Sequence, residues 1–291
     1  MLKKRIVATL IIKNGMVVQS IGFRTYLPVG DPRVSVEFLS AFGIDEIIIL
    51  DIDATRQNRK LNFALITEIS KRIFVPLTVG GGIKTLEDMR KLLHCGADKI
   101  AINAAAIKNP HIIKEAALVF GNQCIVVSLD VKANKGGEYE IFSDSGNIST
   151  GLEPVSFARK VEQLGAGEIL INSIDRDGSK SGYDVPLIKS ITAAVKIPVI
   201  ACGGVGLPNH FLEGFEKGEA SASAAGNFFH FTEHSPILVK SYLAQKKVDV
   251  RLDTYANYAD ATLDKKTGRI SKRPESYLDK LRFEYLPEEV I

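Results

Sequence analysis

Residues 75–83 read Val-Pro-Leu-Thr-Val-Gly-Gly-Gly-Ile, and residues 197–205 read Ile-Pro-Val-Ile-Ala-Cys-Gly-Gly-Val. Two further pairs of segments, 43–48 with 165–170 and 96–100 with 218–222, repeat at the same offset of 122 residues. Solenoid repeats are shorter, about 20–50 residues. The offset therefore indicates two homologous halves of one domain, and each half can be compared with the other.

Composition narrows the class of protein. A chain of 291 residues, 45% hydrophobic and 24% charged, can form one large α/β barrel or two ordinary domains. Its three cysteines have no metal-ligand spacing, which favours reduced thiols and a cytoplasmic protein. The net charge of +3 does not indicate binding to nucleic acid. No apolar run resembles a signal peptide or a membrane span.

Eight short apolar runs alternate with segments of helical period. The runs start near Arg5, Glu46, Pro76, Lys99, Cys124, Glu168, Pro198 and Ser221. The helical segments lie near 32–43, 59–73, 85–95, 109–120, 154–164, 185–195, 208–217 and 236–245. Eight such units over about 250 residues predict an α/β fold, a single (β/α)8 TIM barrel. A doubly wound sheet is the alternative, but two equivalent halves close naturally into a ring.

The repeat also predicts the domain boundaries. We expect residues 1–252 to form the barrel, with half-barrels of about 1–122 and 123–252. A small hairpin is predicted within 131–151. Residues 253–291 form a polar C-terminal extension, either a partly ordered tail or an arm that docks a partner.

Glycines follow two matched strands, at 80–82 and at 203–204. Active sites of such barrels lie at the C-terminal ends of the strands, where glycine lets backbone N–H groups approach an anion. Two clusters on opposite sides of the ring predict two phosphate sites and a ligand phosphorylated at both ends. The alternative is that the glycines only form tight turns.

Four charged residues stand at the opposite, N-terminal, ends of strands. They are Arg5, Glu46, Lys99 and Glu168. Two cations and two anions that converge on the barrel floor can neutralise one another, as buried charges require. The sequence leaves open whether they form a plug or a gate.

Three long motifs resemble HisF, the cyclase subunit of imidazole glycerol phosphate synthase. They are residues 175–184 (Asp-Arg-Asp-Gly-Ser-Lys-Ser-Gly-Tyr-Asp), 78–83 and 142–151, and the resemblance extends from Met1 to about Leu252. It implies a barrel that docks a HisH-like glutaminase on its N-terminal face and passes ammonia to the other face. There ammonia reacts with PRFAR, a bis-phosphorylated ribulosyl-aminoimidazole carboxamide, without a metal or cofactor.

The resemblance also implies roles for individual residues. The four charged residues of the floor would form an ammonia gate, and Asp130 would be one of two catalytic aspartates. Phosphate contacts are implied for Gly82, Asn103, Asp177, Gly178, Gly204, Ala225 and Gly226.

This chain departs from the family at the other catalytic aspartate. The segment that matches Val126–Asp130 in the first half is Val7–Ile11, which places isoleucine where the strand 1 aspartate belongs. Isoleucine cannot transfer a proton, and loss of a general acid–base group commonly costs about 10²–10⁴-fold in rate. Asn14 and Gln19 also replace an acid and a base typical of the family.

Three functions follow from these observations. The first is a HisF-like subunit that supplies ammonia from a glutaminase to a sugar amidotransferase, for acetamidino modification of a surface sugar. The alternative is a working cyclase of histidine biosynthesis, which makes imidazole glycerol phosphate and AICAR from PRFAR, with Asp51 or Asp53 covering for Ile11. The third is a noncatalytic scaffold that binds a phosphorylated metabolite.

Overall fold

The computed structural model describes residues 3–57, 59–134, 136–230, 235–252, 262–264 and 266–268. Eight parallel strands pair side by side, and the pairing of β10 with β7 closes them into a ring. The strands are β1 (Arg5–Lys13), β4 (Glu46–Asp51), β5 (Leu77–Gly80), β6 (Lys99–Ile102), β7 (Ile125–Ala133), β10 (Glu168–Ser173), β11 (Val199–Cys202) and β12 (Ala222–Ala225). The predicted (β/α)8 barrel is confirmed.

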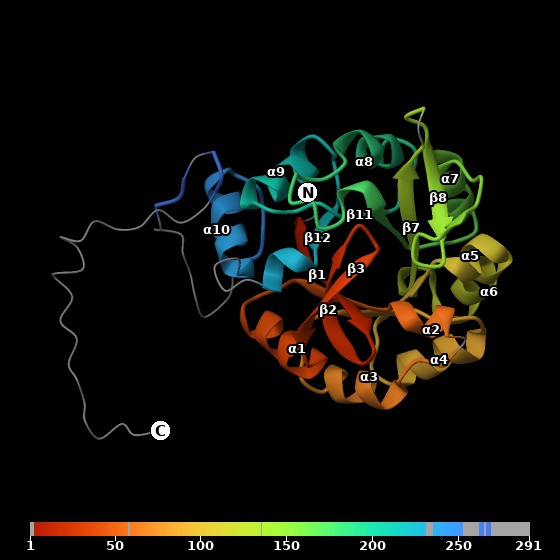
Figure 1. Cartoon of the computed structure of the whole chain (residues 1–291). Coiled ribbons are helices and arrows are strands. Elements are labelled where there is room, and N and C mark those ends of the chain that lie inside the picture. The colour runs from red at the N-terminus through yellow and green to blue at the C-terminus, as the bar shows by residue number, and fades with distance from the viewer. Residues whose placement is uncertain are drawn as a thin grey trace, which may run out of the picture.

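Helices cover the outside of the ring (Figure 1). They are α1 (Pro32–Ala41), α3 (Phe63–Ser70), α4 (Leu86–His94), α6 (His111–Phe120), α7 (Pro154–Gln163), α8 (Val185–Thr192), α9 (Pro208–Glu216) and α10 (Pro236–Gln245). All eight fall inside the predicted segments. The segment 59–73 is the least accurate prediction, because its helix is shorter at both ends. No helix among the described residues has both the length and the apolar composition to cross a membrane.

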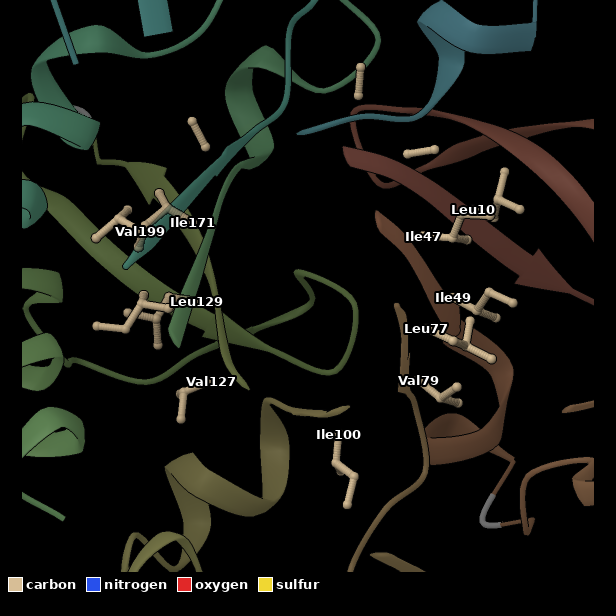
Figure 2. Close-up of a cluster of buried hydrophobic side chains, with 14 of the residues drawn as sticks. Leu10, Ile47, Ile49, Leu77, Val79, Ile100, Val127, Leu129, Ile171 and Val199 are labelled. Carbon is tan, nitrogen blue, oxygen red and sulfur yellow. The ribbon is translucent and has the colours of Figure 1, made fainter. Parts of the chain in front are cut away.

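The side chains of the strands form two separate apolar layers. Those facing outward pack against the helices, as Ile47, Leu129 and Ile171 do (Figure 2). Those facing inward form a smaller cluster drawn from strands alone, which includes Val7, Ile48, Val126, Leu170, Ile200, Ala222 and Ala224. Because successive strand residues point to opposite faces, neighbouring residues of one strand belong to different layers, as Ile47 and Ile48 of β4 do.

The two halves match in structure as well as in sequence. Helices α1 and α7 begin and end 122 residues apart, and each has proline at its first position after an acidic N-cap, Asp31 or Glu153. The register places Val7 opposite Glu46 and Val126 opposite Glu168. This register confirms the alignment of the first strand of each half.

Several elements lie outside the eight units. The predicted hairpin above the fifth strand is present, with β7 paired to β8 (Tyr139–Ser143), which in turn pairs with β9 (Ile148–Ser149). A second hairpin, β2 (Met16–Ile21) and β3 (Thr25–Gly30), was not predicted. Short helical turns follow strands at α2 (Ile52–Arg56), α5 (Ala104–Lys108), η2 (Ile174–Arg176) and η3 (Asn227–His230), and η1 (Asn122–Cys124) precedes β7. Most of the expected extension 253–291 lies outside the described residues.

Candidate functional site

Two adjoining cavities open at the C-terminal ends of the strands and hold about 820 and 650 Å³ of empty space, counting the part open to solvent. Both are lined by Ile11, Ser20, Phe23 and Asn172. The larger cavity lies over the ends of β4, β5, β6 and β7, and the smaller lies over the ends of β10, β11 and β12. Together they form one elongated site that spans the barrel mouth.

All seven residues implied as phosphate contacts line these cavities. Gly82 and Asn103 line the larger cavity, and the smaller one is lined by Asp177, Gly178, Gly204, Ala225 and Gly226. The residues thus divide into two groups at the two ends of the site. This is the arrangement that a ligand with two phosphates requires.

Glycine is needed at both ends for steric reasons. At Gly82 the backbone φ is +67°, and a Cβ atom would lie 2.6 Å from the Cβ of Ala54. At Gly204 φ is +100°, and a Cβ would lie 2.2 Å from the carbonyl oxygen of Gly182. Larger residues would close the approach of backbone N–H groups to the cavity.

Asp130, at the mouth end of β7, lines the larger cavity. The amide of Asn103 donates a hydrogen bond to its carboxyl group at 3.3 Å. Burial, followed by the negative charge of Asp177, raises the pKa of Asp130 to about 7, although a hydrogen bond from Asn172 opposes the shift. An acid with this pKa can both accept and donate a proton near neutral pH.

Ile11 and Asp51 line the same cavity, and the carboxylates of Asp51 and nearby Asp53 are each paired with a cation. The carboxyl group of Asp51 accepts an ion-pair contact from Arg59 at 2.8 Å and caps α2. Asp53 is buried and pairs with Lys13 at 3.0 Å. Burial by itself would raise the pKa of Asp53, but the hydrogen bonds from Lys13 and the Asn14 amide outweigh it. The net pKa is below the usual value, so the carboxyl group stays ionised.

The unpredicted β2–β3 hairpin is bound to the barrel mouth. The hydroxyl of Ser20 donates to the carboxylate of Asp177 at 2.6 Å, and the amide of Phe23 donates to it at 3.1 Å. The side chain of Asn227 exchanges hydrogen bonds with the backbone of Ser20 at 3.0 and 2.7 Å. The Asp177 carboxylate therefore fixes the hairpin to the barrel mouth.

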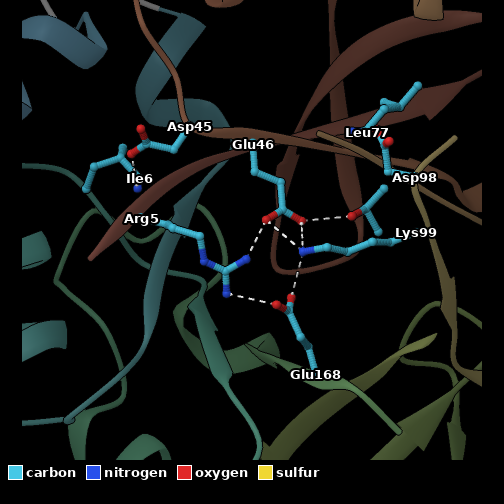
Figure 3. A network of polar contacts seen from close by, with 9 residues as sticks. Arg5, Ile6, Asp45, Glu46, Leu77, Asp98, Lys99 and Glu168 are labelled. Atoms are coloured by element: carbon cyan, nitrogen blue, oxygen red, sulfur yellow. Dashed lines mark hydrogen bonds and ion pairs between the residues drawn. The ribbon is translucent and has the colours of Figure 1, made fainter. Parts of the chain in front are cut away.

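The four predicted charges of the floor converge at the other end of the barrel (Figure 3). Arg5 contacts Glu46 at 2.6 Å and Glu168 at 3.0 Å, and Lys99 contacts each of the two carboxylates at 3.1 Å. Thr78 donates to Glu46 at 2.8 Å. The cations and anions alternate in a closed ring, so no charge in it is left uncompensated.

Sequence reasoning missed several residues that line the cavities, among them Ser20, Phe23 and Asn172. Ser20 and Phe23 belong to the hairpin, and the Asn14-Gly15 turn that joins β1 to β2 is a signal for it that our sequence analysis did not use. Asn172 could have been found, because it stands at the polar end of a predicted strand. In the described part of the chain, no group of three or more His, Cys, Asp or Glu residues could hold a metal ion.

Comparison with known proteins shows what this chain resembles. The profile of a family described as "Histidine biosynthesis protein" matches residues 5–235. A Vibrio vulnificus protein, provisionally named imidazole glycerol phosphate synthase subunit hisF2, is 46% identical over 264 residues, which cover 91% of this chain and 97% of its own length. The imidazole glycerol phosphate synthase subunits HisF of Clostridium botulinum and a Hydrogenobaculum strain are 47% identical over 253 and 252 residues, covering 87% of this chain and 100% of each relative.

Proposed function

The chain belongs to the HisF family of imidazole glycerol phosphate synthase subunits, and from that premise we propose that it combines PRFAR with ammonia supplied by a HisH-like glutaminase. The observation that carries the proposal is the division of the implied phosphate contacts between two adjoining cavities. The names of the three relatives favour this reaction over sugar modification, which none of them mentions.

The interior of the barrel supports a route for ammonia. Above the charged ring, the inward-facing side chains of Val7, Ile48, Val126 and Leu170 are apolar and buried. An apolar passage admits neutral ammonia much more readily than ammonium, because an isolated charge is costly to desolvate. We therefore assign the ring of Arg5, Glu46, Lys99 and Glu168 to the entrance of the passage.

Three phenylalanines that precede the N-terminal ends of β4 and β5 support partner docking on this face of the barrel. Phe74, just before β5, is 95% exposed, and its backbone amide contacts the Ser40 hydroxyl at 3.4 Å. Phe38 is 36% exposed and stacks on Phe42, with ring centroids 4.4 Å apart. Exposed aromatic groups are typical anchors of protein interfaces.

The second half shows that the fold itself does not require these aromatic residues. The positions 122 residues later hold Lys160, Leu164 and Lys196. The backbone amide of Lys196 is bonded to Glu162, as that of Phe74 is bonded to Ser40 at the matched position. Because the backbone bond is the same in both halves while the side chains differ, the aromatic residues Phe38, Phe42 and Phe74 of the first half favour a contact with a partner protein.

Asp130 carries the proton transfers of the proposed reaction. Its pKa of about 7 leaves both protonation states populated near neutral pH. Ile11 offers no second group, so we expect cyclisation to be about 10²–10⁴-fold slower than in a site with both carboxylates.

Ile11 also favours a second candidate, in which the barrel delivers ammonia to a separate sugar amidotransferase and does not cyclise PRFAR. One assay distinguishes the two functions. Purified protein, given PRFAR and high ammonium without glutaminase, forms imidazole glycerol phosphate slowly under the first proposal, and Asp130→Asn abolishes the product. Binding of PRFAR without any product would refute the cyclase proposal and support the second.

A further inference from the structure

The glycine loop that follows β11 is supported by a histidine that lies behind it. The amide of Gly206, which lines the smaller cavity, donates a hydrogen bond to Nδ1 of His210 in α9 at 3.1 Å. The same ring packs against Gly182, where a Cβ atom would lie 3.3 Å from its Cδ2. The Gly182 amide in turn donates to the carbonyl of Gly204 at 2.8 Å. His210 therefore supports the loop of the smaller cavity both directly and through Gly182.

The first half of the barrel holds its matched loop with a different acceptor. Lys84 and Asp88 stand 122 residues before Gly206 and His210. There the Lys84 amide donates to the Asp88 carboxylate at 3.2 Å. Nδ1 of histidine and Oδ of aspartate are the same number of bonds from the backbone, so the two side chains make equivalent contacts. The repeat has thus kept the bond and changed the chemistry of its acceptor.

The start of the helix after each loop depends on the same residue. In the first half, the Thr85 hydroxyl accepts the Asp88 amide at 3.1 Å, and the Asp88 carboxylate accepts the Thr85 amide at 3.1 Å. The matched cap of α9 is Leu207, whose side chain cannot accept a hydrogen bond. His210 therefore takes over in the second half a task that Thr85 and Asp88 share in the first.

The two acceptors respond differently to protons. A carboxyl group keeps an acceptor oxygen whether or not it is protonated, whereas an imidazole that gains a second proton has two donors and no acceptor. Protonation of His210 would direct an N–H group at the Gly206 amide and break their hydrogen bond. The loop of the smaller cavity is therefore sensitive to protons, and the matched loop of the larger cavity is not.

The surroundings of His210 keep its ring neutral at pH 7. Burial lowers the pKa of His210 below its usual 6.5, and the carboxylate of Glu213 on the same helix opposes this shift more weakly. On the facing loop, Arg176 and Lys180 pack against the backbone of residues 203–206, and neither cation can pair with a protonated ring. The ring therefore gains its second proton only as the pH falls below 6.5.

We propose that His210 is a pH-sensitive positioning residue, which in its neutral form holds loop 203–206 in the shape that receives one phosphate group and on protonation releases the loop. Ligand binding at the smaller cavity then weakens in acid, while the end of the site at the larger cavity keeps its shape. The effect on the ligand rests on the proposed function, but the positioning of the loop does not.

NMR spectroscopy of the unliganded protein tests the positioning by itself. As the pH is lowered from 8 to 5, the Gly206 amide resonance should shift with the same midpoint as the His210 ring. His210→Asn is the matched control, because its Oδ1 atom can accept the same hydrogen bond and does not titrate. In that variant the Gly206 amide should not shift with this midpoint. The Lys84 amide of the first half should not follow it in either protein.

Calorimetric titration with PRFAR tests the effect on the ligand. The unmodified protein and His210→Asn should bind PRFAR with affinities within about twofold of each other at pH 8. At pH 5 the unmodified protein should bind about twofold to tenfold more weakly than His210→Asn, as loss of one hydrogen bond predicts. Because the two proteins are compared at the same pH, protonation of the phosphate groups affects both equally.

His210→Asp, which copies the first half, provides a second variant if asparagine disturbs folding, with the same results expected. A Gly206 amide that does not follow the His210 ring would overturn the inference. Equal PRFAR affinities at pH 5 would overturn it as well, and so would tighter binding by the unmodified protein, since attraction by the imidazolium charge would then dominate. Failure of the unmodified protein to bind PRFAR at pH 8 would instead refute the proposed function, and the NMR result would still decide whether His210 positions the loop.

Discussion

Restoring an aspartate at position 11 should raise the rate of PRFAR cyclisation. Ile11 lines the same cavity as Asp130 and stands at its matched position in the first half. A second acid–base group contributes about 10²–10⁴-fold, equivalent to about 3–5 kcal/mol of barrier. We expect Ile11→Asp to gain a rate within this range, measured with PRFAR and saturating ammonium under single-turnover conditions.

The structure also indicates how much folding stability the substitution Ile11→Asp loses. Ile11 is only half-buried, since it faces the cavity, so loss of its apolar contacts should lower stability by about 1–2 kcal/mol. The new carboxylate would raise the pKa of Asp130 further, because two acids facing one site resist joint ionisation. The pH–rate profile should then report the pair of carboxylates and not Asp130 alone.

Ile11→Asn is the matched control, since asparagine has the shape of aspartate but cannot act as a general acid or base. If Ile11→Asp cyclises PRFAR no faster than Ile11→Asn, the missing carboxylate is not what limits this chain. A fast unmodified protein would equally refute the reasoning.

Three further outcomes are expected. The pKa of Asp130 is raised from 3.8 to about 7, so the folded state binds this proton more tightly than the unfolded state does. The resulting stabilisation is complete below about pH 4 and is lost as the pH rises through 7. Urea titrations of Asp130→Asn should lack this pH-dependent loss of stability. Phe74→Ala should weaken glutaminase binding by about 2 kcal/mol, roughly thirtyfold, while Lys196→Ala at the matched position changes it less than about twofold in calorimetry. Gly204→Ala places a Cβ 2.2 Å from a carbonyl oxygen. Its control is Gly137→Ala, because Gly137 has a similar φ of +83° with open space around it. In thermal denaturation, Gly204→Ala should destabilise the protein by more than about 2 kcal/mol relative to that control.

The repeat in the sequence predicted most of the fold. Apolar runs gave the eight strands because a parallel strand buried on both faces leaves a continuous hydrophobic pattern. The comparison of Val7–Ile11 with Val126–Asp130 also aligned the first strand of each half correctly, as the register shows. The β2–β3 hairpin was missed although Asn14-Gly15 is a hairpin turn signal, whereas its contacts to Asp177 and Asn227 join segments that are far apart in the chain and depend on the fold.

By itself, the sequence determined the barrel, its doubling and the contrast between Ile11 and Asp130 at matched positions, since strand patterns and residue identities are local properties of the chain. Only the tertiary structure decided how those residues combine. The closed ring brings Arg5, Glu46, Lys99 and Glu168 into mutual ion-pair contact. It also leaves the buried oxygen of Asn172 without a partner, because hydrogen-bond satisfaction depends on neighbours that folding alone assembles.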